Sequence, residues 1–325
     1  MEKRNLGLSG LGVMPIGFGC MGITHANGTP MEKQDGIAVI RAAYETGYTF
    51  FDTAECYTGI YPDGREVYNE DIVGEALRPV RDKVVLATKF GVTHDGRQLI
   101  LDSRPETIRR SVEGSLKRLG TDYIDLYYQH RIDPKVAPEE VAVTMSVLQK
   151  EGKIRAWGIS EANEAYLRKA HAVCPVAAIQ NRYSMLARWH EQLFPVLEEL
   201  HIAYVAFSPL GNGFLSGKYD ANTKFEQNTD FRSSMPQYTQ EGYAKNRVLL
   251  DLLEKLAQAK NATPAQLSLA WMLHKKPFII PIPGSRKPAR LRENIGAAAI
   301  ALTAAEVAEI DAEIKTMELR VFNGH

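Results

Sequence analysis

The chain has 325 residues, of which 45% are hydrophobic and 24% are charged, a balance typical of a soluble globular protein with a large core. Lysine plus arginine and aspartate plus glutamate are equal at 39 each, so the charge pattern favours neither nucleic acid nor an anionic membrane as a partner. The absence of a charged-then-apolar leader and of an apolar run near 18 residues predicts a cytoplasmic protein. The three cysteines, Cys20, Cys56 and Cys174, have no metal or disulfide spacing, which fits a reducing compartment.

A glycine-rich stretch near the start, GFGCMG at residues 17–22, matches the G-x-G-x-x-G spacing of many Rossmann dinucleotide sites. That fingerprint needs a strand that ends at the first glycine and a helix that begins within the glycines. Here a loop-forming stretch, ITHANGTP, follows, and helical periodicity begins only near Met31. The acidic residues at the expected distance for a ribose contact, Asp35 and Glu45, lie inside that amphipathic helix. The sequence therefore argues against a Rossmann site.

Short apolar or β-branched runs alternate with longer amphipathic stretches along the whole chain. Such alternation indicates parallel strands joined by helices, and eight units favour a closed (β/α)₈ TIM barrel of the α/β class over an open sheet. The opening RNLGLSGLGVMP, residues 4–15, resembles a β-hairpin that caps the bottom of this barrel. With no disordered linker, residues 1–325 are predicted to form one domain. The eight expected strands are MPIGFG, YTFFDT, KVVLATKF, DYIDLYYQH, IRAWGIS, VAAIQN, IAYVAFS and FIIPIPGS.

Helix boundaries are marked by local signals. In DSRPETIRRSVEGSLKRLG, we expect Ser103 as the N-cap, Pro105 in the first turn and Gly120 just after the end. The interval between the seventh and eighth strands, residues 208–277, is much longer than the others. It is rich in Gly, Asn, Ser and Pro to about residue 240 and then contains two helical segments. We interpret its first part as a mobile loop over the site.

Chemistry-bearing side chains follow consecutive strands. The second strand ends in Asp52 with Tyr57 just beyond, the third ends in Lys89 and the fourth in His130. Each alone has an ordinary explanation, such as a cap, an ion pair, a rim histidine or amphipathic packing. Because the active site of a (β/α)₈ barrel forms at the carboxyl ends of its strands, the four together predict a catalytic site.

The pieces DTAECYTG, ATKF, YIDLYYQH, GIS, AIQNRYS and FSPLGNGFLSGKY follow one another in the order found in one family. With these motifs, and from LGLSGLGVMPIGFGCMG to PIPGSRKPARLRENIGA, the chain resembles the aldo-keto reductase superfamily nearly end to end. The resemblance implies reversible, nicotinamide-dependent and metal-free reduction of small aldehydes and ketones on a barrel without a Rossmann fold. It also implies that Met21 and Gly22, in the first βα turn, lie close to the reactive end of the cofactor. No oligomeric state is indicated.

Carbonyl reduction needs a proton donor beside the developing alkoxide, and the resemblance assigns that role to Tyr57. A free tyrosine has a pKa near 10, so a neighbouring cation, Lys89, is expected to lower the pKa of Tyr57 toward working pH. Asp52 should pair with Lys89, and His130 should orient the substrate oxygen. Lys89 could instead be a Schiff-base nucleophile, as in barrel aldolases, but the neighbouring Tyr, His and cofactor motifs favour the reductase reading.

The resemblance also assigns cofactor contacts to the later strands. Ser160 and Gln180 match the family's carboxamide-binding positions, Phe207 the aromatic that stacks on the nicotinamide, and Asp52 is a further cofactor contact. A departure from the family is Glu161, which follows Ser160 where Asn or another polar residue is usual, and Asn163 is a candidate substitute. The segment that resembles the pyrophosphate clamp comprises Ser208, Pro209, Leu210, Gly211 and Lys218.

Within that segment, GNGFLSGK nearly matches a P-loop, but Asn212 stands in the first-glycine position, which excludes that reading.

Basic residues gather where the helix after the eighth strand begins. Backbone donors and the helix dipole attract anions there, and arginine binds phosphate in a bidentate manner, so the cluster favours the 2′-phosphate of NADPH over NADH. Without the resemblance, a solvated helix face would be the preferred explanation. The residues concerned are Gly284, Arg286, Lys287 and Arg290, with Glu293 and Asn294 resembling adenine contacts.

A second function class shares this barrel: the β subunits of potassium channels bind the same cofactor with little turnover. Those subunits tend to carry a different residue at the position of His130, so the sequence favours an enzyme. The substrate pocket is expected near Met21, Phe90 and Trp189, the 212–240 loop and the C-terminal MELRVFNGH. These residues suggest small aromatic or dicarbonyl aldehydes. Cys56, next to Tyr57, is either a redox-sensitive thiol or, as we prefer, a packing residue.

Overall fold

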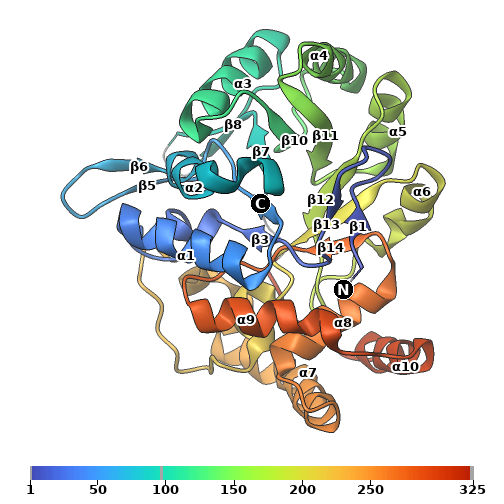
Figure 1. The fold of residues 1–325 in the computed structure, drawn as a ribbon. Helices are drawn as coiled ribbons and strands as arrows, with labels where there is room; N and C mark the ends of the chain where they lie inside the picture. The colour runs from blue at the N-terminus through green and yellow to red at the C-terminus, as the bar shows by residue number, and fades with distance from the viewer. Residues whose placement is uncertain (1, 96–97, 323–325) are drawn as a thin grey trace.

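The computed structural model describes residues 2–95 and 98–322. In this part of the chain eight parallel strands form one curled sheet, in the order β14-β13-β12-β11-β10-β7-β4-β3. The backbone N–H of Gly17 donates to the carbonyl of Pro281 at 2.9 Å, which joins the first strand of the sheet to the last. The predicted (β/α)₈ TIM barrel is therefore confirmed (Figure 1). The strands are β3 (Phe18–Gly19), β4 (Phe50–Asp52), β7 (Val85–Phe90), β10 (Ile124–Gln129), β11 (Ile154–Ser160), β12 (Ala178–Arg182), β13 (Ala203–Phe207) and β14 (Ile279–Pro281).

Helices surround the ring of strands, as Figure 1 shows. They connect each strand to the next, which keeps the strands parallel. None of the described helices is both long and apolar enough to span a bilayer. Their bounds are α1 (Lys33–Thr46), α2 (Asn69–Leu77), α3 (Pro105–Leu119), α4 (Pro138–Lys150), α5 (Glu164–Val173), α6 (Phe194–Glu199), α7 (Gln240–Ala259), α8 (Pro264–Lys275), α9 (Pro288–Gly296) and α10 (Ala304–Lys315).

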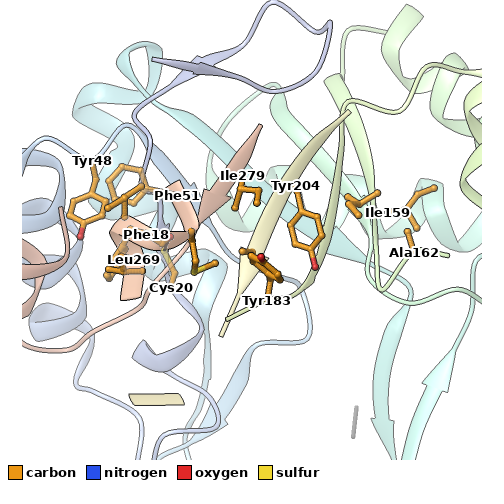
Figure 2. Packing of buried hydrophobic residues seen from close by; sticks show 14 of the residues in the cluster. Phe18, Cys20, Tyr48, Phe51, Ile159, Ala162, Tyr183, Tyr204, Leu269 and Ile279 are labelled. Carbon is orange, nitrogen blue, oxygen red and sulfur yellow. Dashed lines mark hydrogen bonds between the residues drawn. The ribbon is translucent and has the colours of Figure 1, made fainter. Parts of the chain in front are cut away.

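Two apolar clusters hold the barrel together, one on each face of the sheet. The larger fills the space between strands and helices, where Phe18 packs edge-on against Tyr48 and Phe51 (Figure 2). The smaller fills the barrel interior and includes Phe50 and Tyr128. Because neighbouring residues of a strand point to opposite faces, Phe50 faces inward and Phe51 outward. The same alternation turns Asp52, the next residue of β4, back toward the interior.

The predicted N-terminal hairpin closes the bottom of the barrel. Strands β1 (Arg4–Asn5) and β2 (Gly12–Val13) pair antiparallel. Leu6, Leu11 and Val13 from this hairpin are buried in the interior cluster, so they seal that end against water.

The glycines of GFGCMG serve barrel closure. An added Cβ at Gly19 would lie 2.8 Å from the carbonyl of Ile282, and one at Gly17 would lie 2.6 Å from the Phe50 ring. Only glycine allows the first and last strands to approach this closely. A short 3₁₀ turn, Met21–Ile23, follows β3, and α1 begins at Lys33. These glycines therefore do not open a helix, and the Rossmann interpretation is excluded.

One predicted helix cap is wrong. The N-cap of α3 is Arg104, not Ser103, because the Ser103 hydroxyl accepts a hydrogen bond from Nε2 of Gln129 at 2.9 Å inside the fold. The Oδ1 of Asp102 accepts from the Arg104 backbone N–H at 3.1 Å. Gly120, with φ 62°, ends α3 as predicted.

The long interval before β14 contains the two predicted helices, α7 and α8. Its first part is a loop that carries short 3₁₀ turns and crosses to the loop after β3. Phe231 N–H donates to the Ala26 carbonyl at 2.9 Å, and Gly28 N–H donates to the Thr229 carbonyl at 3.0 Å. Two further hairpins rise beside the mouth: β5 (Thr58–Ile60) with β6 (Glu66–Tyr68), which projects from the barrel in Figure 1, and β8 (Val92–Asp95) with β9 (Gln98–Leu101).

Candidate active site

Three of the predicted catalytic side chains meet at the carboxyl end of the barrel. Nζ of Lys89 donates to Oδ1 of Asp52 at 2.6 Å, to the Tyr57 hydroxyl at 3.1 Å and to the Thr53 carbonyl at 2.8 Å. Lys89 is completely buried. Its three N–H donors match these three oxygens, so Asp52, Lys89 and Tyr57 form one hydrogen-bonded unit.

The register of the sheet explains this meeting. Asp52 at the end of β4 lies beside Ala87 of β7. Lys89 lies two residues beyond Ala87 and therefore points to the same, inner face. Its side chain can then reach Asp52 and the turn that carries Tyr57.

Asn69, at the start of α2, holds that turn in place, a role that the sequence did not reveal. Its backbone N–H donates to the Tyr57 carbonyl at 3.0 Å, and its side-chain oxygen accepts from the Thr53 hydroxyl at 2.7 Å. Its amide donates to Oγ1 of Thr24 at 2.8 Å and to the Cys20 carbonyl at 3.0 Å. These buried bonds connect the turn to the loop after β3.

His130 stands beside Tyr57, with ring centroids 5.7 Å apart in an edge-on arrangement. Burial, with the positive charges of Lys89 and Arg131, lowers the pKa of His130 well below its ordinary value. Its ring is therefore neutral at neutral pH. Nδ1 lies 3.4 Å from the Cys56 thiol. If the thiol donates to Nδ1, the ring proton is on Nε2, which can then donate to a carbonyl oxygen.

The expectation that Lys89 brings the pKa of Tyr57 below its ordinary value is wrong for this structure. Burial raises the pKa of Tyr57 and outweighs the opposite effect of Lys89. Burial alone would lower the pKa of Lys89, but Asp52 and Tyr57 raise it above its ordinary range. At neutral pH the site thus contains a cationic Lys89 and a protonated Tyr57, the state that a proton donor requires.

Cys56 is a poor candidate for a redox-sensitive thiol. Burial raises its pKa to about 12, and only 8% of the residue is exposed. The thiolate, which is the reactive form, is therefore scarce. Its contact with His130 gives it a role in the site instead.

We expect native protein to resist iodoacetamide at mildly alkaline pH, because Cys20, Cys56 and Cys174 are all buried and burial raises the pKa of each. Intact-mass measurement should find no adduct on the folded chain and three adducts after denaturation, one for each cysteine. A folded-state adduct on Cys56 would restore the redox interpretation.

The predicted carboxamide contacts lie at the ends of neighbouring strands. The Ser160 hydroxyl donates to the Gln180 carbonyl at 2.9 Å, and Nε2 of Gln180 donates to Oδ2 of Asp52 at 2.7 Å. A residue that the sequence reading missed, Arg131, donates from Nη1 to Oγ of Ser160 at 3.1 Å. Asn163 accepts from the Tyr166 N–H as the N-cap of α5, so its carboxamide oxygen is already engaged.

Phe207, at the end of β13, is half-buried. Arg182 stacks on its ring at 5.0 Å from the centroid, and on Phe322 of the C-terminal segment at 5.4 Å. The chain then turns sharply: Ser208 and Gly211 both have φ near the left-handed region, 50° and 56°. A non-glycine residue in this conformation is uncommon and concentrates at functional sites.

The rest of the predicted pyrophosphate segment follows this turn. A 3₁₀ stretch, Gly211–Ser216, comes next, and Lys218 is exposed beyond it. Pro209 is buried and Leu210 is half-buried. The buried Oδ1 of Asn212 has no hydrogen-bond partner among the described residues.

The basic residues after β14 differ from one another in their contacts. Nε of Arg286 donates to the Gly22 carbonyl at 2.5 Å and Nη1 to the Thr29 carbonyl at 2.9 Å, which ties the start of α9 to the loop after β3. Nη1 of Arg290 pairs with Oε2 of Glu293 at 2.5 Å. The remaining predicted residues of this region are the exposed Lys287 and Gly284, and the buried Asn294.

A cavity of about 640 Å³ opens over the ends of β10, β11 and β12, and Arg131, the residue after His130, lines it. Trp189, one of the three residues expected near the substrate, also lines it. Phe90 does not: it is completely buried and packs against Tyr127 at 5.1 Å, because strand alternation turns it outward when Lys89 points inward. Met21 packs against Tyr57 and its neighbours. Of MELRVFNGH, residues 323–325 lie outside the described residues.

Among the described residues, no group of three or more His, Cys, Asp or Glu side chains is arranged to hold a metal ion.

Comparisons with known proteins agree with this geometry. A model of the aldo/keto reductase family matches residues 15–315. The chain is 41% identical to a probable aldo-keto reductase of Glycine max over 95% of its length and 88% of that protein. It is 39% identical to the aldo-keto reductase str7 of Strobilurus tenacellus, over 92% of this chain and 88% of that one.

Solved structures of aldo-keto reductases have a similar fold. A glycerol dehydrogenase of Gluconobacter oxydans superposes with a TM-score of 0.85 at 28% identity, over 100% of this chain and 98% of that one. The holo form of an aldo-keto reductase of Bacillus halodurans superposes with a TM-score of 0.78 at 26% identity, over 100% and 99% of the two chains.

Proposed function

Because this chain belongs to the aldo-keto reductase family, we propose that it reduces small aldehydes and ketones to alcohols with NADPH, and that Tyr57 is the proton donor. The observation that carries the proposal is the 3.1 Å hydrogen bond from Lys89 to the Tyr57 hydroxyl, in a fully buried setting beside a neutral histidine. NADPH, when bound, supplies the hydride that the carbonyl carbon accepts.

The protein's own residues perform the remaining work. His130 orients the carbonyl oxygen through an N–H donor, and Tyr57 transfers its proton to that oxygen as negative charge develops. Lys89 then stabilises the tyrosinate at the atom it already contacts, and Asp52 keeps the ammonium in position. A buried, prearranged cation of this kind needs no reorganisation during the reaction.

The residues at the mouth fit a nicotinamide dinucleotide. Ser160 and Gln180 lie together where they would hold the carboxamide, and the half-buried Phe207 would stack on the ring. The unpartnered Oδ1 of Asn212 and Nη2 of Arg286 offer buried polar atoms along the path toward α9. The N-terminus of α9, with Lys287 and Arg290, would attract the phosphates.

Preference for NADPH over NADH should depend on Arg290. Arg290→Ala is expected to weaken NADPH binding about tenfold and NADH binding by less than about twofold, because only NADPH carries the 2′-phosphate that the guanidinium would hold in a bidentate contact. Fluorescence titration with both cofactors measures this. Equal losses would show that Arg290 does not contact the 2′-phosphate, and Lys287→Ala then tests the next candidate.

The proposed function is tested by mixing purified protein with NADPH, or separately NADH, and a panel of aldehydes including methylglyoxal and nitrobenzaldehydes. Aldehyde-dependent oxidation that favours NADPH supports the proposal. Tight NADPH binding without oxidation of any member would instead favour a cofactor-binding regulatory subunit. His130 argues against that alternative, because a subunit without turnover has no need of a second group at the carbonyl oxygen.

A further inference from the structure

Arg131 occupies an unusual position between His130 and the 640 Å³ cavity that it helps to line. Its Nη1 donates to the His130 carbonyl at 2.7 Å and to the Ser160 hydroxyl at 3.1 Å. Both acceptors are uncharged oxygens. Its Nε is buried and has no hydrogen-bond partner within the described part of the chain.

The structure pairs no carboxylate with Arg131 among the residues it describes, whereas another arginine, Arg188, pairs with Glu191 and Asp311. The carboxylates that line the same cavity have other contacts. Glu161 accepts from the Arg182 backbone N–H at 3.2 Å and lies 3.9 Å from His190. Glu164 pairs with Arg168 at 2.8 Å.

A second guanidinium lines the cavity close by. The Arg182 guanidinium lies against the rings of Phe207 and Phe322. Burial lowers the pKa of Arg182, the charge of Glu161 opposes that effect, and the charge of Arg131 adds a smaller lowering. The cavity is thus lined by two guanidinium groups, Arg131 and Arg182, and by the carboxylates of Glu161 and Glu164.

We propose that Arg131 and the cavity beside His130 form a subsite for a carboxylate on the carbonyl substrate, so that the preferred substrates are aldehydes or ketones that carry an acidic group. The inference rests on the proposed function and names the substrate class of that site. Hydrogen bonds hold Nη1 of Arg131 and leave the buried Nε without an acceptor among the described residues, and a guanidinium fork matches carboxylate geometry. Arg131 acts on specificity and takes no part in proton transfer.

The test compares two aldehydes of nearly equal size and shape, para-carboxybenzaldehyde and the uncharged para-nitrobenzaldehyde. The quantity measured is the ratio of their kcat/KM values, in which any general change in activity cancels. Because the nitro group activates the carbonyl in every variant alike, the subsite is read from the change in this ratio, which should favour the carboxylate at least about tenfold more in the native protein than in Arg131→Met, as expected for charge-assisted hydrogen bonds. Arg131→Met should bring the ratio close to that of a site without charge preference, and Arg131→Lys should give an intermediate ratio.

Arg109→Met is the matched control, because it removes one exposed arginine from α3, outside the residues that line the cavity. It should leave the ratio as in the native protein. A ratio that is unchanged in Arg131→Met, or that changes equally in Arg109→Met, would overturn the subsite.

A second measurement tests the carboxylate subsite even if the protein does not reduce aldehydes. If neither aldehyde is reduced, calorimetry with para-hydroxymethylbenzoate and para-nitrobenzyl alcohol measures the same discrimination without turnover. Tighter binding of the carboxylate that is lost in Arg131→Met supports the subsite even then. Equal binding of the two alcohols, or a preference that survives in Arg131→Met, contradicts it.

Discussion

Tyr57→Phe is expected to lower kcat/KM for aldehyde reduction about a thousandfold while NADPH affinity stays within about twofold of the native value. The substitution removes one hydroxyl from a ring that is 9% exposed, so packing is preserved. It also removes the proton that the developing alkoxide would receive. Steady-state kinetics and cofactor titration on the same preparation measure both quantities.

The loss should appear in kcat, because the hydroxyl acts on the transition state more than on the bound substrate. Tyr61→Phe is a matched comparison, since it removes the hydroxyl of another buried tyrosine, which donates to the Met31 carbonyl at 2.9 Å and contacts none of the catalytic side chains. If Tyr57→Phe keeps more than about a tenth of native turnover, Tyr57 is not the principal donor.

Lys89→Met should destabilise the protein by about 3–5 kcal/mol at neutral pH, because it leaves the buried Asp52 carboxylate without its cation. Burial raises the pKa of Asp52, and loss of Lys89 removes the main opposing influence. Denaturant unfolding of native and variant protein gives the difference in free energy of unfolding.

The loss of stability in Lys89→Met should depend on pH, and the raised pKa of Asp52 determines the direction of that dependence. In the folded variant the buried Asp52 has a raised pKa and is tolerated while its carboxyl is protonated. The variant therefore loses stability as the pH rises from about 4, the pKa of Asp52 in the unfolded chain, through its pKa in the folded protein. The difference in free energy of unfolding between native protein and Lys89→Met should therefore be smaller in mild acid than at neutral pH.

The double variant Asp52→Asn, Lys89→Met is the control, because it removes both charges and should recover most of the stability without recovering activity. If the loss of stability in Lys89→Met does not depend on pH, or if the double variant is no more stable than Lys89→Met, then Lys89 stabilises the fold through packing alone.

The positions of the strand ends could be predicted because they depend on local pattern. Apolar runs locate the strands, parallel order brings their carboxyl ends together, and alternation decides which side chain faces inward. Asp52 and Lys89 follow from that reasoning alone. Phe90 could have been excluded by the same rule, since it follows the inward-facing Lys89 directly.

Properties that depend on burial or on distant partners could not be predicted. The pKa of Tyr57 reflects desolvation by residues from several strands, and the neighbouring cation gave the opposite expectation. The contact between Cys56 and His130 joins residues 74 apart in sequence. Arg286 carries no local signal that its guanidinium turns toward the loop after β3.

That contact of Arg286 has a consequence for the order in which the molecule becomes functional. It spans 264 residues to the Gly22 carbonyl, and the hydrogen bond between Gly17 and Pro281 spans the same number of residues. Contacts between distant parts of a chain form late, because a long loop must close first. A nascent chain whose last fifth has not yet emerged lacks β14, the strand to which the first strand of the barrel is hydrogen-bonded. Cofactor binding would then report completion of synthesis, and a chain truncated before β14 should fail to bind it.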